Sequence, residues 1–483
     1  MRLPIYIASY RLRDRPAWAH SDQIRRWTPK MIKEIAIRIY ADRPRFKRLG
    51  LEALWIAVGQ GLAVLGGLVG VRLLTQFLEP AVYGQLALGM TLATFLQQVA
   101  LGPLGGSFLR FFRPAEEAGQ LGSYCEAVQI LLKRSTSILV GIIVPVALGF
   151  WGLGHVHWLG LMLAAFIFAL ISGYNSSLDS MQNAARQRAV VAWHQGLGQW
   201  LRFLVAVLLI SVLGPSSSVA MLGYALASGI VLGSQLTFFR KKIWAKVLAQ
   251  SNDGESDTKT WVRKILSYAG PFMIWGPLTW VHLASDRWAL QLFRSTSDVG
   301  LYAALYQVGY YPLTFLSSII MNFVSPIFFS LAGSGSNPMR LKRARRLNKL
   351  LIFISLLLTA LFTLLAFILH KQVFSLLVAS QYRAISYLLP WMLMSGGLFA
   401  TGQAASLMLL TELDSRALLM PKVLTAIMGI LMNALGAYLF GLIGVVFATV
   451  IFSLIYFLWV MFLAHKNIGR QHEKLSRKNI RTL

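Results

Sequence analysis

Two adjacent charges interrupt a stretch that is otherwise apolar and long enough to span a membrane. Asp286 and Arg287 lie in TWVHLASDRWALQLFR, residues 279–294. An ionisable side chain at the bilayer centre costs about 2.5–3.5 kcal/mol even on lenient insertion scales. In a functional interpretation, Arg287 presents a cation to a ligand, and Asp286 binds H⁺ or Na⁺ on the face it shares with His282. In a structural one, the pair fixes helix packing. Successive helical residues are about 100° apart, so the two side chains need not face each other.

Two further arginines lie in apolar stretches. Arginine holds phosphate oxygens in pairs through its planar fork, so Arg72, Arg202 and Arg287 are candidate ligands for a diphosphate. For Arg72 and Arg287 the alternative is that the side chain snorkels to the outer surface. Arg202, in the middle of QWLRFLVAVLL, is harder to explain that way. Arg294 is expected at an outer loop, where truncation should matter little.

Polar side chains recur at helical spacing in three stretches. Such long stripes favour a water-lined face. The alternative is hydrogen bonding between helices, typically worth about 0.6 kcal/mol per contact. The first two stripes are the candidate lining of a cavity: Thr91, Thr94 and Gln98, then Gln307, Tyr311, Thr314, Ser318 and Asn322. The third is Thr279, His282 and Asp286. A separate face of small residues predicts close helix packing: Gly59, Ala63, Gly66 and Gly70.

The composition identifies the elements that must position these residues. Of 483 residues, 56% are hydrophobic and 13% charged, whereas a soluble protein carries about 25% charged residues. Apolar windows of about 20 residues, each able to cross about 30 Å of hydrocarbon, recur along the chain. They predict an all-α membrane protein with about 12 transmembrane helices, near 53–78, 83–108, 129–153, 157–183, 190–213, 218–239, 266–293, 298–330, 347–370, 384–411, 418–440 and 442–464.

The net charge of +28 is grouped rather than spread. Basic segments flanking spans follow the positive-inside rule, so an even number of spans places all of them, and both termini, in the cytoplasm. There they should attract anionic membrane lipids, and their grouping argues against nucleic acid as a partner. Of the 46 Lys and Arg, the blocks hold 13 in residues 1–50, 7 in 240–264, 6 in 340–349 and 6 in 464–483.

The N-terminal 50 residues lack the apolar core of a signal peptide. They are expected to include an amphipathic helix on the cytoplasmic membrane surface, with Met31, Ile32, Ile35 and Ile39 on one face.

A polar linker divides the spans six and six. It reads SNDGESDTKT, residues 251–260. The predicted divisions are a basic N-terminal segment (1–50), a first lobe (51–240), a cytoplasmic linker (241–264), a second lobe (265–465) and a basic tail (466–483). The halves also repeat. VRLLTQFLEPAVYGQLAL and DRWALQLFRSTSDVGLYAAL each run from an Arg through a short loop into the next span, with Gly84 matching Gly300. Parallel repeats of this kind are common among transporters.

These repeated junctions resemble a known family, the polysaccharide flippases. The junction in the first half of that family is matched by Arg72, Leu74, Leu78, Pro80, Tyr83 and Gly84. The junction in the second half is matched by Asp286–Arg287 with Val299, Gly300, Leu301 and Tyr302. The superfamily also contains multidrug and toxic-compound extruders and lipid II flippases. The resemblance covers about residues 50–465 and implies two six-helix lobes around a central cavity that opens alternately to each face.

The resemblance also implies a substrate and a location. It implies that the chain moves undecaprenyl-diphosphate-linked oligosaccharide from the cytoplasmic to the periplasmic leaflet of a bacterial inner membrane. The pathway would be O-antigen lipopolysaccharide, capsule or exopolysaccharide synthesis. H⁺ or Na⁺ would be the coupling ion, and the polysaccharide polymerase machinery a partner.

Two other function classes remain open. A multidrug extruder would need unpaired carboxylates for cationic drugs, but only Asp179 and Asp286 are placed within spans, and Asp179 is near an inner end. A membrane glycosyltransferase or acyltransferase would need an acidic pair and a large outer loop, and the predicted outer loops are short. His155 and His157 are two metal ligands without a third, and the single Cys125 excludes an internal disulfide. No enzyme activity, cofactor or metal is therefore expected.

Overall fold

The structure is a computed structural model that describes residues 54–241, 255–332, 338–411 and 419–480. Trp55–Leu483 forms one compact unit and Met1–Leu54 another. The amphipathic helix predicted around Met31–Ile39, like the rest of the 1–50 segment, lies outside the described residues. Within the described part the chain is helical throughout and contains no strand.

The first half of the compact unit consists of six spans. The second span is one long rod assembled from α2, a single π-helical turn and α3. In chain order the elements are a first helix Leu54–Phe77, α2 Pro80–Leu96, η2 Gln97–Leu101, α3 Gly102–Glu117, α4 Leu121–Gly152, α5 Val156–Ala184, α6 Arg188–Leu213 and α7 Ser217–Phe239.

The second half also supplies six spans, although its last two form one continuous helix by backbone hydrogen bonding. Gly441 (φ 64°) breaks α13, and the backbones of Gly436 and Gly444 pack against each other beside that break. The elements are α9 Glu255–Phe293, α10 Thr296–Ala332, α11 Pro338–Leu377, η4 Ser380–Leu388, α12 Leu389–Thr411 and α13 Leu419–Ile480.

The predicted number of spans is confirmed for the described residues. Nine helices are long and apolar enough to cross a membrane when α13 is counted as one. Its break at Gly441 adds a tenth span, and α9 and α10 complete the twelve.

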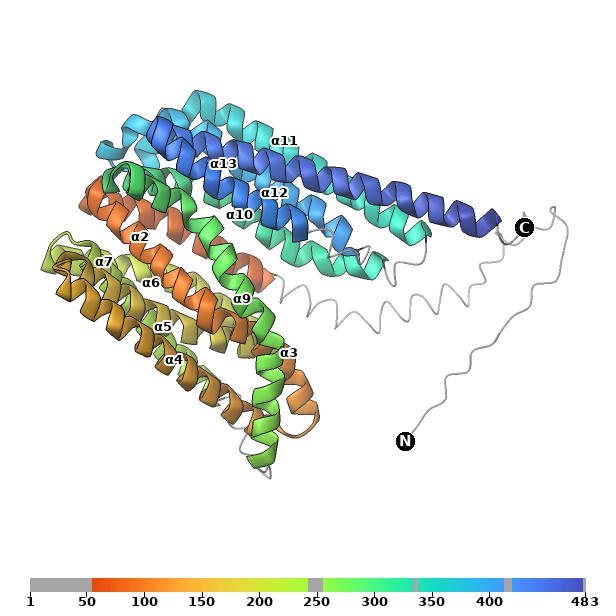
Figure 1. The fold of residues 1–483 in the computed structure, drawn as a ribbon, viewed down its shortest axis with the longest axis horizontal. Helices are drawn as coiled ribbons and strands as arrows, with labels where there is room; N and C mark the ends of the chain where they lie inside the picture. The colour runs from red at the N-terminus through yellow and green to blue at the C-terminus, as the bar shows by residue number, and fades with distance from the viewer. Residues whose placement is uncertain (1–53, 242–254, 333–337, 412–418, 481–483) are drawn as a thin grey trace. The chain divides into compact units, whose positions relative to one another are not determined.

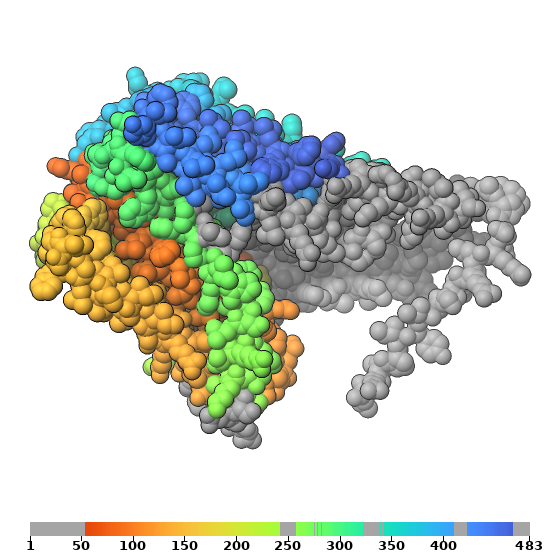
Figure 2. Space-filling view, in the orientation of Figure 1, coloured from red at the N-terminus to blue at the C-terminus, as the bar shows by residue number. Residues whose placement is uncertain are grey.

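The helices form two lobes, shown in Figure 1 in red to yellow-green for the first and cyan to blue for the second. In the first lobe α7 packs between α5 and α6, and in the second α12 packs against α10, α11 and α13. Helix α9 belongs to neither lobe entirely, because it packs on α13 and also on α3 and α4. The space-filling view in Figure 2 shows α9, in green, passing from the blue helices to the orange surface of α3.

The inner part of α9 is buried in an apolar core of the first lobe. Trp261 and Ile265 pack there with Phe108 and Tyr124. Two prolines, Pro271 and Pro277, stand inside the helix beyond this core, where proline removes backbone hydrogen bonds and bends a helix. The predicted division at residue 265 stays a prediction, and the packing ties α9 to both lobes.

The lobes meet at the two glycines that the repeat had matched. A Cβ added to Gly84 of α2 would overlap the Thr296 carbonyl of α10, and one added to Gly300 would overlap the Pro80 carbonyl. Glycine at both positions lets the two backbones touch. The small-residue face of the first helix behaves as expected too, with Gly59, Gly66 and Gly70 pressed against α6.

Candidate functional site

A polar cavity lies between the lobes, among the first helix, α2, α5, α6, α9 and α10. It consists of two adjoining pockets of about 440 and 420 Å³. Five side chains line both: Met90, Thr94, Gln199, Arg202 and Tyr311. Because of these shared walls the two pockets adjoin, and we describe them together as the cavity.

Most of the predicted lining residues border this space. Thr91 is buried and also serves packing, because its hydroxyl accepts a hydrogen bond from Trp288 Nε1 of α9 at 3.0 Å. Two predicted residues bond their own helix, Thr314 to the Tyr311 carbonyl and Ser318 to the Phe315 carbonyl. The Asn322 side chain lies outside the described residues. The lining residues among those predicted are Thr91, Thr94, Gln98, Gln307 and Tyr311.

Arg202 of α6 is a cation that faces the cavity without a partner carboxylate among the described residues. Its guanidinium carbon lies 4.9 Å from the ring centre of Phe168 and 5.7 Å from that of Tyr224. Its Nε is buried, and no acceptor reaches it within the part of the chain that the structure describes. Contact with two rings compensates a buried cation by about 0.5–2 kcal/mol each. Donor groups of the fork therefore remain available to a ligand.

Arg287 of α9 borders the same cavity but is paired. Its Nη1 lies 3.2 Å from Asp286 Oδ1 and 3.3 Å from the Leu283 carbonyl, and its guanidinium lies 4.5 Å from the Tyr306 ring centre. With only 14% of the side chain exposed, Arg287 does not snorkel to the surface. Although residues 286 and 287 are about 100° apart on the helix, their charged groups lie 3.2 Å apart and form an ion pair.

The Asp286 carboxylate is fully engaged. Oδ2 accepts a hydrogen bond from the Tyr302 hydroxyl at 2.8 Å, and Oδ1 accepts one from the Arg287 backbone N–H at 2.7 Å. Asp286 is 6% exposed. The side chain of His282, its predicted companion in ion coupling, lies outside the described residues.

Arg72, near the C-terminal end of the first helix, reaches across to the second lobe. Its Nη1 donates to the backbone carbonyls of Ser375, at 3.2 Å, and Val378, at the C-terminal end of α11. A cation is favourable at a helix C-terminus, where unpaired carbonyls concentrate negative charge. In this structure the Arg72 fork is bound to a helix end and not to the cavity.

The second lobe returns the same kind of contact. Gln381 Nε2 donates to the carbonyls of Thr75 and Leu78 at 3.1 and 3.0 Å, and the Tyr382 hydroxyl donates to the Leu78 carbonyl at 2.8 Å. Each lobe thus caps a helix of the other. We call these contacts, from Arg72, Gln381 and Tyr382, the outer latch.

A second polar cluster lines the cavity in the first lobe. Asp179 of α5 accepts hydrogen bonds from Gln195 Nε2 at 3.0 Å and from Gln235 Nε2 at 2.6 Å, and Gln195 Oε1 accepts one from Gln60 at 3.0 Å. Helical spacing could have revealed this cluster, since two stripes run along α5 and α6, the first with the spacing used for α2 and the second with that used for α10: Ser172, Asn175 and Asp179, and Gln195, Gln199 and Arg202.

Two other predicted residues are placed as follows. Arg294 directly follows the C-terminal end of α9, and its side chain is not free. Its Nε and Nη2 donate to the carbonyls of Ala437 and Tyr438 at 2.8 and 2.9 Å. Cys125 is buried. Across the described residues, no group of three His, Cys, Asp or Glu side chains could hold a metal ion.

Comparison with known proteins supplies the family. Residues 49–332, more than half of the chain, match the model of the family described as "Polysaccharide biosynthesis protein". The chain belongs to this family. No curated protein matches the sequence of this polysaccharide biosynthesis protein.

Solved structures resemble this polysaccharide biosynthesis protein over most of its length. An inward-facing multidrug resistance MATE family transporter of the MOP superfamily superposes with a TM-score of 0.63 at 12% identity, covering 88% of this chain and 98% of that one. For the lipid II flippase MurJ, in an inward closed conformation, the values are 0.60, 12%, 86% and 87%. For the Vibrio cholerae MATE transporter VcmN in its bent form they are 0.56, 13%, 88% and 98%.

Family and fold each add one finding. The family connects the chain with polysaccharide biosynthesis, and the solved structures show that it has the fold of MATE transporters and of the lipid II flippase MurJ. The recognised resemblance and the expected two-lobed helical fold are confirmed.

Proposed function

We propose that the chain moves undecaprenyl-diphosphate-linked oligosaccharide from the cytoplasmic to the periplasmic leaflet of a bacterial inner membrane, for a surface polysaccharide. It does so by alternating access, driven by H⁺ or Na⁺. Both termini and the basic blocks lie in the cytoplasm, as the positive-inside rule requires. The outer latch then closes the periplasmic side of the cavity in the state described here.

The observation that carries this proposal is the unpaired guanidinium of Arg202 inside a polar cavity. A diphosphate needs a donor fork, and Arg202 has ring contacts but no carboxylate partner among the described residues. The glycan needs hydroxyl and amide groups, and Gln199, Gln307 and Thr94 line the same space. Arg287 lines the same pocket as a second cation, already neutralised by Asp286.

The alternative, a multidrug extruder, finds one supporting observation in Asp179. This carboxylate lines the cavity and could attract a cationic compound. Both of its oxygens are, however, occupied by the amides of Gln195 and Gln235. A carboxylate held by two amide donors is less available to a drug than the open fork of Arg202 is to a phosphate.

Ion coupling is assigned to Asp286, in the second lobe. It is buried, carries the negative charge next to Arg287 and bonds the Tyr302 hydroxyl. A proton or sodium ion on Asp286 would release Arg287 from its partner and add a cation to the cavity. Binding of the ion to Asp286 would thereby change the affinity of the cavity for a diphosphate.

A vesicle assay tests the proposal. The purified protein is reconstituted into vesicles with undecaprenyl-diphosphate-linked oligosaccharide in both leaflets, and an impermeant glycosidase outside cleaves only glycans of the outer leaflet. We expect the protein to make the inner pool cleavable and Arg202→Ala to prevent this. Arg110→Ala, at an exposed arginine of α3, is the matched control. Gradient-driven uptake of a cationic dye, without glycan movement, would identify the extruder instead.

A further inference from the structure

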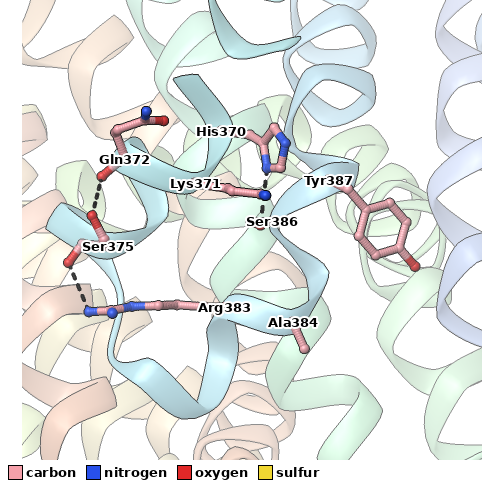
Figure 3. Close-up of a pocket in the computed structure, with 8 residues that line it drawn as sticks. All are labelled: His370, Lys371, Gln372, Ser375, Arg383, Ala384, Ser386 and Tyr387. Atoms are coloured by element: carbon pink, nitrogen blue, oxygen red, sulfur yellow. Dashed lines mark hydrogen bonds between the residues drawn. The ribbon is translucent and has the colours of Figure 1, made fainter. Parts of the chain in front are cut away.

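A second polar pocket, of about 620 Å³, lies apart from the transport cavity, at the end of α11 where the outer latch binds. It is formed by the last two turns of α11 and by η4 (Figure 3). It shares no lining residue with the cavity between the lobes. Its described lining contains no carboxylate and comprises His370, Lys371, Gln372, Ser375, Arg383, Ala384, Ser386 and Tyr387.

The cations of this pocket contradict the usual distribution of charge. Lys and Arg are depleted from outer loops, and two turns at the same end of the first lobe, 153–155 and 214–216, contain neither. Arg72 and Arg294 also lie at outer ends, but the helix carbonyls that they cap account for both. The exposed Lys371 forms no ion pair within the described part of the chain. Arg383 also caps a helix carbonyl, but through one contact only, from Nη2 to the Ser375 carbonyl at 3.2 Å, so its other donors have no partner among the described residues.

The neighbouring surface locates the pocket at the level of lipid headgroups. The turns of α11 before it expose apolar side chains, with Leu364 65% and Ile368 69% accessible. The first polar residue after them is His370, whose Nδ1 lies 3.1 Å from Ser386 Oγ. Cations directly beyond a lipid-facing apolar surface are placed to meet phosphate groups. Figure 3 shows Lys371 and Arg383 on the facing segments of the α11–η4 turn.

We propose that this pocket binds the phosphate group of a lipid in the outer leaflet, with Lys371 and Arg383 as its cations. Two lipids carry that chemistry: a bulk anionic phospholipid and the diphosphate carrier lipid that the protein itself would deliver. Arginine and lysine donors reach a phosphate in either, and the hydroxyl of Ser386 can donate beside them.

Site-specific crosslinking tests the site. A photoreactive benzoylphenylalanine replaces the exposed Tyr387, and the full chain is reconstituted into phosphatidylcholine vesicles. One arm adds phosphatidylglycerol, and another adds undecaprenyl diphosphate. We expect adducts with an added anionic lipid in preference to phosphatidylcholine, whose phosphate is neutralised by its own choline, and a roughly tenfold or greater loss of these adducts in K371A/R383A. The lipid found in the adduct identifies the source.

The control uses exposed cations at the other end of α11. R346A/K349A removes the same number of charges from the same helix and should leave the adducts at Tyr387 unchanged. K371Q/R383Q keeps polar side chains of similar reach, so that loss of adducts with unchanged size-exclusion behaviour reports charge and not folding. The proposal would be overturned if phosphatidylcholine gave as many adducts as the added lipids. It would also be overturned if the adducts persisted in both K371A/R383A and K371Q/R383Q.

Discussion

Arg202 and Arg287 border one cavity from opposite lobes, yet their surroundings differ. Arg287 has a carboxylate at 3.2 Å, a helix carbonyl at 3.3 Å and a tyrosine ring at 4.5 Å. Arg202 has two aromatic rings and, among the described residues, no acceptor for its buried Nε. When a buried ion pair loses one partner, the remaining charge is left without compensation. Arg202 has no such partner to lose, so the cost of burying its charge is already present in the folded protein. From this comparison we propose ligand binding for Arg202 and, for Arg287, a role in structure and in coupling through Asp286.

The largest expected effect on stability comes from breaking the pair. Arg287→Ala would leave the buried Asp286 without its cation, a loss that costs about 3–5 kcal/mol for buried pairs. We expect a lower melting temperature in detergent and less folded protein in the membrane. The double variant D286N/R287A should recover most of this stability, because it removes both charges. Equal melting temperatures for Arg287→Ala and the unchanged protein would mean that the pair does not stabilise the fold.

A smaller change separates coupling from stability. Asp286→Asn keeps the side-chain shape and can still accept a hydrogen bond from Tyr302, whose hydroxyl now lies 2.8 Å from Oδ2. If Asp286 carries the coupling ion, transport driven by an ion gradient should stop, while protein level and binding of undecaprenyl diphosphate persist. Measuring all three in the same membranes decides the matter. Loss of folded protein would instead assign the residue to structure alone.

The Tyr302 hydroxyl should contribute less. Tyr302→Phe removes one charge-assisted hydrogen bond to Asp286, of a type worth about 1.5–3 kcal/mol. The melting temperature should fall by less than in Arg287→Ala. Phe replacing the nearby exposed Tyr438, at the outer end of the same lobe, is the control and should leave the melting temperature unchanged. A fall as large as that of Arg287→Ala would show that Tyr302, and not Arg287, is the main partner.

Arg72 should affect conformation more than affinity. Arg72→Ala removes the hydrogen bonds to Ser375 and Val378 and leaves those from Gln381 and Tyr382. The outer latch should weaken, and spin labels on Gly152→Cys and Tyr387→Cys should report a larger share of long distances between the lobes. Affinity for undecaprenyl diphosphate should stay within about twofold, since no charge-assisted contact to the ligand is lost. A large loss of affinity with unchanged distances would return Arg72 to the substrate site.

Much of the fold follows from the sequence, because a span is defined by local properties. Twelve apolar windows, the turn at Gly441 and the matched Gly84 and Gly300 all appear as short-range patterns. The double attachment of α9 does not, because whether Trp261 packs on α3 and α4 or on its own lobe depends on the positions of distant helices. The apolar content of α9 suits both.

The cavity lining was predictable for a similar reason. Helical spacing in α2 and α10 indicated Thr94, Gln307 and Tyr311, and the same spacing in α5 and α6 could have indicated Asp179 and Gln199. The hydrogen-bond acceptors of each arginine were not predictable from the sequence. The acceptors of Arg72 are 303 and 306 residues away in the sequence. The mid-span position of Arg202 did indicate, from sequence alone, that snorkelling would not account for it.

Affinity for undecaprenyl diphosphate, measured on purified protein in detergent, tests the central claim most directly. Arg202→Ala should weaken binding roughly tenfold or more, as expected for one lost contact of about 1.5–3 kcal/mol. Arg202→Lys should recover only part of it, because a point charge cannot replace the fork. Arg110→Ala should bind normally, and the melting temperature of Arg202→Ala should not fall, because no ion pair is broken. Unchanged affinity in Arg202→Ala would contradict the account.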